Sequence, residues 1–575
     1  MKKIAIVGFG PRGLSALENL FIEVSLRKLQ TKFHVTLFEH TNQLGSGKVW
    51  DIKQSGVNWV NISERALKEL EGRQEIIIYN MKIPSFPSYT EWLPNKDKNL
   101  KNTEADRFPP RKKMGEYLSE RSESIVEVLE KNKFVTVINT LISNADFHNN
   151  NLVLKDLYGN SFTFDEVLLT IGHQPTKIDE DIVKYQIESN NNFFCFPEPY
   201  PLDDIIKSKE IEKGKNIAIR GFGLAMIDVV RALTIEKEGV FKIENKTNFE
   251  SRFIKSDSVP KQIIPYSLDG LPMAPKPLNA KLDSVFKISE KQAKLFEKEI
   301  KKVARGVNKA KGNLFLKRIM AKISAEIFIN LENNILSKEL SKEEVDKIII
   351  SWLSDIDFKH ELIQDIDCRT DVLIESFVKM ACGERSISLD YCVGQVWRHC
   401  QRILYSEFSH AQVSEEIIAS VIELDEQMKR YSYGPPVESM QQLLSLLKAN
   451  ILNLDYCNNP KITVSKNGLM FKNKEEKIKV DVIINSVLSP PKLMEVTSPI
   501  IQNLLRNDLI KPIHSELGIH TREDATIVSA DKENNIPLSV LGRLSKGSVI
   551  GVDAILECFG SRIKDWATGA VNRMN

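Results

Sequence analysis

Three glycines near the start of the chain have the spacing needed to hold the phosphates of a dinucleotide. Gly8, Gly10 and Gly13 fit the pattern G-x-G-x-x-G. In such a loop the first glycine permits a tight turn, the second lets the backbone approach a pyrophosphate, and the third lets a helix pack on a strand. The N–H groups and the dipole at the start of that helix attract phosphate. Glu39 lies 26 residues beyond Gly13, close to where an acid binds ribose hydroxyls.

The residues around this loop favour a strand, a turn and a helix in that order. The apolar run 4–7 predicts a buried parallel strand, and the apolar residues of 14–21 share one helix face. A second strand is expected over 34–38, directly before Glu39. A glycine turn in a βαβ unit without a ligand is the alternative, but the order of the three elements favours a nucleotide loop.

A second strand, turn and helix begin at Asn216. Gly221 and Gly223 match the pattern, whereas Met226 stands in place of the third glycine. Because the pair that faces the pyrophosphate is kept, the segment predicts a second dinucleotide. A basic residue beyond this unit would favour NADPH over NADH, and the candidates are Arg252 and Lys255, with Ser256.

Composition and charge restrict the class of protein. The 575 residues predict three or four domain-sized units, and 42% apolar with 27% charged residues is an ordinary globular composition. A net charge of +2 argues against a dedicated nucleic-acid-binding protein. Seven widely spaced cysteines without a C-x-x-C pair fit a reducing compartment. No apolar run reaches the length of a membrane span, so we expect a cytoplasmic protein.

Several separated motifs resemble those of bacterial flavoproteins that bind two dinucleotides, a group that includes FAD-dependent urate hydroxylases and aspartate N-monooxygenases. The motifs are Gly8–Gly13, Phe108–Leu118, Thr170–Pro175, Arg220–Thr234, Gly270–Pro272 and Leu541–Gly547. This chain has Leu268 where the family usually has an arginine before Gly-Leu-Pro. The resemblance implies FAD on the first loop and NADPH, or NADH, on the second.

The resemblance also implies a set of cofactor-binding residues. Those for FAD are Gly8, Gly10, Pro11, Arg12, Gly13, Glu39, Gly45, Gly47, Trp59, Asn61, Arg111, Gly172, His173, Gly542, Arg543 and Gly547, and those for the nicotinamide cofactor are Gly221 and Gly223. Trp59 could instead be a core aromatic residue. His173 is expected to contact the cofactor through its backbone. Arg111 begins a helix, where a cation opposes the dipole, and this favours a phosphate or a substrate carboxylate as its partner.

The expected fold is α/β, with two Rossmann-like dinucleotide-binding domains and an inserted, mainly helical domain. The boundaries are 1–180 and 455–575 for a discontinuous FAD-binding domain, 200–280 for the NAD(P)-binding domain, and 281–454 for a helical substrate or cap domain.

Residues 390–405 contain cysteine and histidine, the types that could suggest a metal site. Cys392, Val396, Cys400 and Ile403 have the spacing of one buried helical stripe, so we expect core cysteines and no metal. Catalytic residues are not identified by any pattern in the sequence. The candidates for substrate contact are Arg111, Arg385, Arg398 and His399.

These features predict an FAD-dependent, NAD(P)H-using monooxygenase. The substrate would be small and polar, such as an amino acid, whose nitrogen would be hydroxylated, or a purine, and dioxygen would be the second substrate. A flavin dehydrogenase or reductase with another acceptor is one alternative, and a non-enzymatic flavin- or nucleotide-binding protein is another. We expect neither nucleic acid nor membrane as a partner, and a homo-oligomer is left open.

Overall fold

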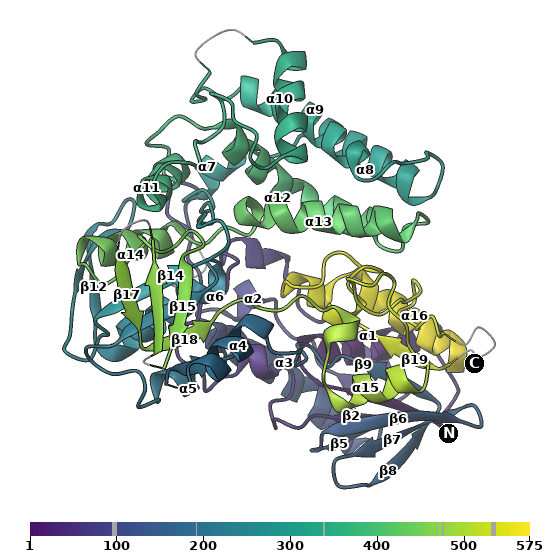
Figure 1. The fold of residues 1–575 in the computed structure, drawn as a ribbon. Coiled ribbons are helices and arrows are strands. Elements are labelled where there is room, and N and C mark those ends of the chain that lie inside the picture. The colour runs from purple at the N-terminus through teal and green to yellow at the C-terminus, as the bar shows by residue number, and fades with distance from the viewer. Residues whose placement is uncertain are drawn as a thin grey trace.

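Two parallel sheets and a layer of helices make up the molecule (Figure 1). The computed structural model describes residues 1–94, 100–190, 192–336, 340–466, 468–473, 476–530 and 536–574. The first sheet lies at the lower right of Figure 1 with both termini, the second sheet lies at the left, and the helical part lies above them. The expected α/β class with two parallel sheets and a helical region is confirmed.

The first sheet has the strand order β19-β9-β1-β2-β5, and its strands are parallel. They are β1 (Lys2–Val7), β2 (Phe33–Phe38), β5 (Val135–Ile138), β9 (Glu166–Leu169) and β19 (Leu538–Val540). Strands buried on both faces read as continuous apolar runs, as in Ile4–Val7. Helices α1 (Pro11–Arg27), α3 (Arg111–Lys131), α15 (Pro499–Arg506) and α16 (Ser561–Met574) belong to this domain.

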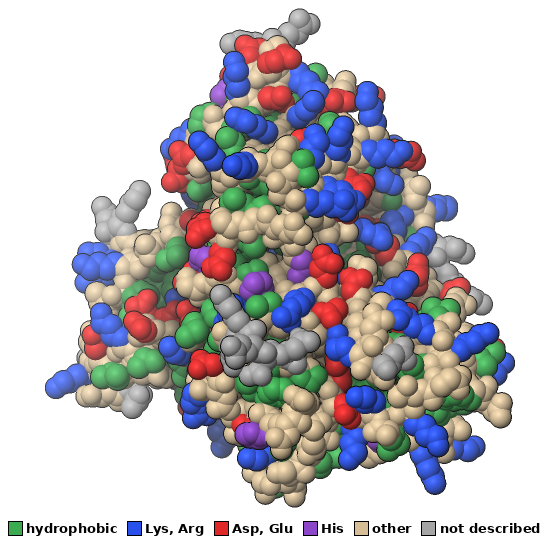
Figure 2. Space-filling view, turned by 90° about the vertical axis from the view of Figure 1, so that its right-hand side faces the viewer, with side chains coloured by type: hydrophobic (Ala, Val, Ile, Leu, Met, Phe, Trp, Pro, Cys, Tyr) green, Lys and Arg blue, Asp and Glu red, His purple; other side chains and the backbone are tan. Residues whose placement is uncertain are grey.

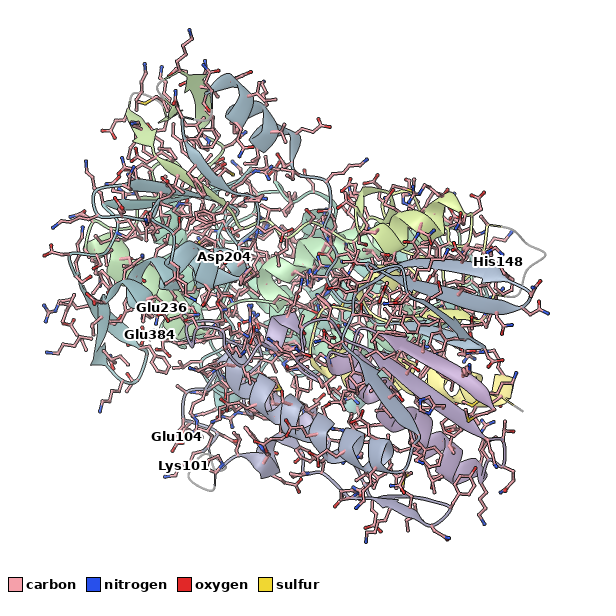
Figure 3. All side chains as sticks on the ribbon, turned by 90° about the horizontal axis from the view of Figure 1, so that it is seen from below. Lys101, Glu104, His148, Asp204, Glu236 and Glu384 are labelled. Carbon is pink, nitrogen blue, oxygen red and sulfur yellow. The ribbon has the colours of Figure 1, made fainter. Side chains whose placement is uncertain are left out.

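Smaller elements extend the first domain. A three-stranded antiparallel sheet consists of β6 (Ile142–His148), β7 (Asn151–Asp156) and β8 (Ser161–Phe164). A hairpin of β3 (Ile76–Ile78) and β4 (Met81–Ile83) and the short α2 (Tyr89–Trp92) complete it. Figure 3 shows His148 at the outer end of this domain, on the side opposite to Asp204 and Glu236 of the second domain.

The second sheet has the order β10-β18-β11-β14, again parallel. Its strands are β10 (Phe194–Phe196), β11 (Asn216–Arg220), β14 (Gln262–Tyr266) and β18 (Val482–Asn485). Helices α4 (Glu180–Glu188), α5 (Leu202–Ile206), α6 (Leu224–Thr234) and α14 (Val437–Lys448) and the strands β12 (Val240–Asn245), β13 (Glu250–Ile254), β15 (Lys461–Ser465), β16 (Gly468–Lys472) and β17 (Lys477–Val480) surround it.

The boundaries expected for the second domain need correction. Strand β18 belongs to the second sheet because it pairs with β10 and β11, and the separate sheet β15-β16-β17 packs on the second domain, because β16 shares a buried core with β11 and β14. Helix α14 also packs on β13, so the helical unit ends near Gly434. The chain returns to the first domain in the segment that contains α15, β19 and α16.

The helical part lies between the two halves of the second domain in sequence. It comprises α7 (Ala280–Ser284), α8 (Glu290–Ala304), α9 (Leu314–Ile329), α10 (Lys342–Ser354), α11 (Thr370–Ala381), α12 (Leu389–Phe408) and α13 (Glu415–Ser432). Capping boxes fix the starts of α8 and α10. Cys392 and Cys400 are buried in α12 as the stripe predicts, and burial raises the pKa of both thiols. Within the described ranges, no helix is both long and apolar enough to cross a membrane.

Candidate cofactor and substrate site

The first glycine loop leaves the start of α1 accessible. Gly8 has a φ of +85°, and a Cβ there would lie 2.8 Å from the carbonyl oxygen of Thr170. A Cβ on Gly13 would lie 2.6 Å from the carbonyl oxygen of Gly8, so both glycines are needed for backbone packing. Gly10 differs, because its φ is −79° and the nearest atom to an added Cβ is the Gly47 Cα at 3.8 Å. The space at Gly10 is therefore free for a ligand.

A second loop lies across the first. The N–H of Gly45 donates to the carbonyl oxygen of Phe9 at 2.7 Å, and Gly45 and Gly47 both have positive φ. Glu39 ends β2 and is buried, and its carboxylate accepts hydrogen bonds from the N–H groups of Phe9 and Thr41 at 2.8 and 2.9 Å. The predicted ribose-binding acid thus holds the glycine loop in place at the end of the sheet.

Unpartnered polar atoms gather in this region. Gln43 Oε1, Ser46 Oγ, Asn58 Oδ1 and Asn61 Oδ1 are buried and have no hydrogen-bond partner among the described residues. Buried polar atoms in native proteins are normally paired. Four such atoms in one loop region are consistent with a polar ligand that completes the site.

Two arginines tie the glycine loop to the last part of the chain. Arg12 lies against Gly542 and donates to the carbonyl oxygen of Val552 at 2.5 Å. The Arg543 Nη1 lies 3.0 Å from the Nε2 of His173. Burial, with Arg543, lowers the pKa of His173 to about 4, so the neutral imidazole accepts a hydrogen bond from the guanidinium. The structure thus brings three separated motifs together.

A network of opposite charges surrounds these arginines. Lys429 of α13 lies 2.8 Å from Asp553, and Lys546 pairs with Glu426. Lys429 and Lys546, together with Arg543, hold the pKa of Asp553 below its usual value against the effect of burial. The guanidinium group of Arg12 donates to a backbone carbonyl and has no ion pair with a carboxylate among the described residues. It is therefore the cation of this network that suits a phosphate best.

The residues around the loop remain partly open to solvent. Many of these residues keep part of their surface exposed. This holds also for His173 and Arg543, although many protein atoms surround their imidazole and guanidinium groups. The partly exposed members are Gly8, Gly10, Pro11, Arg12, Gly47, Trp59, Asn61, Gly172, His173 and Arg543. Figure 2 shows acidic, basic and histidine side chains together in the band where the helical part meets the domains below it.

Glu557 is a buried acid beside this cluster. Its Oε2 accepts from the N–H of Ala554 at 2.8 Å, yet burial, helped by Asp553, raises the pKa of Glu557 to about 7. The carboxyl group of Glu557 therefore binds a proton more tightly in the folded protein than in the unfolded chain. The free energy of unfolding consequently falls as the pH rises from about 4.5 to 7.

We therefore expect Glu557→Gln to raise the free energy of unfolding at pH 8 by up to about 3 kcal/mol. Near pH 4.5 the substitution should change the free energy of unfolding little. Urea unfolding of both proteins at pH 5 and pH 8 measures the difference. An equal effect of the substitution at the two pH values would contradict this account of Glu557.

Arg111 has a protein partner instead of a free guanidinium. Its Nη2 donates to the Oδ2 of Asp228 at 2.7 Å and to the hydroxyl oxygen of Tyr200 at 3.3 Å. The Tyr200 hydroxyl also donates to Asp228, at 2.6 Å. Arg231, on the same helix as Asp228, lies 3.6 Å from the centroid of the Trp59 ring. Arg111 thus forms an ion pair between the first and second domains, and its contact with a phosphate or a substrate carboxylate stays a prediction.

Because this ion pair is largely buried, loss of one partner leaves an uncompensated charge. We expect Arg111→Met and Asp228→Asn each to lower the free energy of unfolding by about 3 kcal/mol. The double variant should lose clearly less than the two losses added together. Urea unfolding of the four proteins measures the coupling, and strictly additive losses would rule the pair out as a unit.

The second glycine pair is arranged like the first. Gly221 has a φ of +104°, and a Cβ there would lie 2.8 Å from the Oγ of Ser486. An added Cβ on Gly223 would meet no atom within 4 Å, so the start of α6 is accessible. Met226 is buried at the place of the third glycine. The loop therefore retains the two features that a pyrophosphate needs.

The residues expected to select NADPH lie outside the second sheet. Arg252 is in the β12–β13 hairpin, where it pairs with Glu244 at 3.1 Å, and the Ser256 hydroxyl donates to the carbonyl oxygen of Lys237. The parallel neighbour of β11 on this side is β14. Ribose selection takes place beyond the end of that strand. The residues there are Ser267, exposed Leu268 and Asp269.

Two of the three substrate-contact candidates in the helical part lie together, and the third lies apart from them. Arg398 of α12 forms an ion pair with Asp283 of α7, and His399 Nε2 lies 3.3 Å from the same carboxylate. Arg385 is exposed in the connection between α11 and α12. Gly547, expected near the cofactor, has a positive φ and packs against Ile513, so its small size serves the turn.

Sequence reasoning missed Lys276. Its Nζ donates to the carbonyl oxygens of Asn61 and Gly434 at 2.8 and 2.7 Å. Asn61 in turn donates from its amide to the carbonyl oxygen of Tyr433 at 2.7 Å. Lys276 therefore joins the first domain to the end of α13. The only local signal is its place between two prolines, which marks an extended segment but no chemistry.

The comparisons with known proteins agree with this geometry for the first part of the chain. Residues 5–174 match a family model described as FAD-NAD(P)-binding. The expected resemblance to proteins that bind these dinucleotides is confirmed for this segment.

Two curated proteins are similar over part of their length. The chain is 27% identical over 250 residues to the uncharacterized protein YdhS of Escherichia coli, which covers 41% of this chain and 40% of that protein. It is 25% identical over 243 residues to nitrosuccinic acid synthase npaA of Aspergillus oryzae. That match covers 41% of this chain and 36% of the synthase. The chain thus matches less than half the length of these relatives.

Solved structures show a weaker overall similarity. A complex of OTEMO with FAD and NADP has a TM-score of 0.43 and 11% identity, and covers 99% of this chain and 83% of its own. Ornithine hydroxylase PvdA from Pseudomonas aeruginosa has a TM-score of 0.43 and 9% identity, and covers both chains fully.

Proposed function

We propose that this protein is an FAD-dependent oxidoreductase that NADPH or NADH reduces, and that it is a monooxygenase of a small polar substrate. The observation that carries the proposal is the accessible start of α1 at Gly10, beside the guanidinium group of Arg12. Helix N-termini and arginines are what pyrophosphates require.

The residues around Gly10 fit FAD. Gly10 and Gly47 leave room for the pyrophosphate, Glu39 lies at the end of β2 for the ribose, and Arg12 supplies charge. Buried polar atoms such as Ser46 Oγ have hydrogen-bonding capacity to spare. Flavin chemistry supplies hydride acceptance from a reduced nicotinamide and electron transfer to dioxygen.

The chain's own residues have three tasks in this proposal. Gly223 and the start of α6 bind the pyrophosphate of the nicotinamide cofactor. The Arg111–Asp228 ion pair orients the second domain against the first. The end of α13 lies against the loop that contains Asn61, through the hydrogen bond from Asn61 to Tyr433, and would help to exclude water from the flavin.

Similarity to a nitrosuccinic acid synthase supports oxidation of a nitrogen in a carboxylate-bearing substrate. An amino acid is therefore favoured over a purine as the substrate. The alternatives are a flavin reductase with another electron acceptor and a non-enzymatic binding protein. An assay of oxygen uptake and cofactor oxidation distinguishes both from a monooxygenase.

The test follows oxygen uptake and NADPH or NADH oxidation by the FAD-loaded protein, with a set of amino acids and with urate. We expect one substrate to accelerate both and to yield a product one oxygen atom heavier. Cofactor oxidation that needs an added electron acceptor, and no oxygenated product from any substrate, would contradict the monooxygenase proposal.

A further inference from the structure

Lys276 is an enclosed lysine without an acidic partner of its own. The Nζ has two backbone carbonyls as partners, and no carboxylate in the described parts of the chain forms an ion pair with it. The nearby acids have other partners, since Asp283 pairs with Arg398 and Asp106 with Arg65. Lys276 is therefore an enclosed cation without a counterion.

The segment around Lys276 is held rigidly. The Tyr391 hydroxyl of α12 donates to the carbonyl oxygen of Pro275 at 2.9 Å. The N–H of Lys276 donates to the carbonyl oxygen of Pro435 at 3.1 Å. These contacts, and the proline on each side, hold the backbone of Lys276, while the carbonyl oxygens of Asn61 and Gly434 hold its Nζ. The ammonium group is thus fixed in position before a ligand arrives.

Lys276 keeps part of its surface exposed although it lies deep in the molecule. When protonated it has three N–H donors, and two of them are bound to the carbonyl oxygens of Asn61 and Gly434. The third has no hydrogen-bond partner among the described residues. Burial, and then Arg398, lower the pKa of Lys276, as expected for a cation that lacks an anion. An anionic ligand would remove this cost.

Asn61 offers a complementary group at the same place. Its backbone carbonyl holds Lys276, and its amide donates to Tyr433, but its Oδ1 is buried without a partner among the described residues. A free donor on a cation and a free acceptor therefore lie on neighbouring side chains. The pair matches the carboxylate and the ammonium group of an amino acid.

We propose that Lys276 binds the carboxylate, and the Asn61 side chain the ammonium group, of an α-amino acid substrate. The inference rests on the proposed function and narrows its substrate to a zwitterion. Arg398, expected from the sequence to contact the substrate, is instead a neighbour whose charge Asp283 neutralises. Lys276 is a binding residue and takes no part in electron transfer.

The test measures L-aspartate binding to the FAD-loaded protein by calorimetry. We expect Lys276→Gln and Lys276→Met to raise the Kd at least tenfold, and Lys276→Arg to restore part of the affinity. Lys287→Met removes an exposed lysine beyond α7 and should leave the Kd unchanged. Succinate, which lacks the amine, should bind more weakly than L-aspartate to the wild type.

Two further measurements keep the test decisive. FAD content and the rate of reduction by NADPH or NADH should stay at wild-type values in the Lys276 variants, which shows that they remain folded at the assay temperature even if loss of the hydrogen bonds to Asn61 and Gly434 lowers the Tm. Equal Kd values for wild type and Lys276→Met, or tight binding of urate and not of L-aspartate, would overturn the inference while leaving the proposed function intact. Protein that cannot bind FAD would instead refute the proposed function.

Discussion

Gly10→Val should give a folded protein that no longer binds FAD. The backbone at Gly10 is extended, with φ −79° and ψ −162°, and an added Cβ has no protein atom closer than 3.8 Å. Valine is therefore compatible with the fold, but its branched side chain occupies the space assigned to the pyrophosphate. We expect about 3 kcal/mol of lost binding energy, which is about a hundredfold in Kd for FAD. Flavin content and fluorescence titration measure it.

The same variant should keep the circular dichroism and the Tm of the wild-type protein measured without FAD. Gly13→Val serves as the contrast, because a Cβ at Gly13 meets the carbonyl oxygen of Gly8 at 2.6 Å and should destabilise the fold itself. Normal flavin content in Gly10→Val would refute the placement of the pyrophosphate at the start of α1.

Gly223→Val should keep FAD but lose reduction by the nicotinamide cofactor. Gly223 precedes α6 as Gly10 precedes α1, its backbone is extended, and no atom lies within 4 Å of an added Cβ. Because the side chain would fill only the second nucleotide site, we expect the rate of flavin reduction at low NADPH or NADH to fall about a hundredfold. Anaerobic stopped-flow absorbance measures this rate.

Chemical reduction with dithionite is the control, because it bypasses the nucleotide and should reduce the flavin of Gly223→Val as fully as that of the wild type. Two variants that differ only in which loop is filled thus separate the two cofactors. Unchanged reduction of Gly223→Val by the nicotinamide cofactors would show that the second loop does not bind them.

The parts of the fold that local sequence determines could be predicted. The loop at Gly8 follows from a short apolar strand, three spaced glycines and an amphipathic helix, all within 30 residues. The buried stripe of Cys392 and Cys400 follows from helical periodicity alone, and both residues are in the core. Such features depend on neighbours in sequence, which a single chain reveals.

Long-range pairing could not be predicted. The apolar run 482–485 predicts a buried strand, but nothing local says that it pairs with β10 and β11 and not with the first sheet. Arg111 finds its carboxylate 117 positions away, at Asp228. Lys276 and Asn61 are 215 positions apart. The cofactor loops are local, whereas the proposed substrate site depends on contacts between all parts of the fold.

The hairpin β12–β13 shows how one insertion changes a functional interpretation. The hairpin lies between α6 and β14 in the sequence. A search for a basic residue soon after α6 therefore finds Arg252 in the hairpin, whereas the strand that pairs with β11 is β14, which ends later in the chain. Asp269, at that end, pairs with Arg430. Leu268 stands there where the resembling family has an arginine. The choice between NADPH and NADH therefore depends on the residues that follow β14.

The visible absorbance spectrum of the purified protein, loaded with FAD and kept free of oxygen, tests the central claim most directly. We expect a bound flavin spectrum that NADPH or NADH bleaches and that air restores. Protein that retains no flavin after loading and gel filtration, or a bound flavin that neither nucleotide can bleach while dithionite can, would contradict the account.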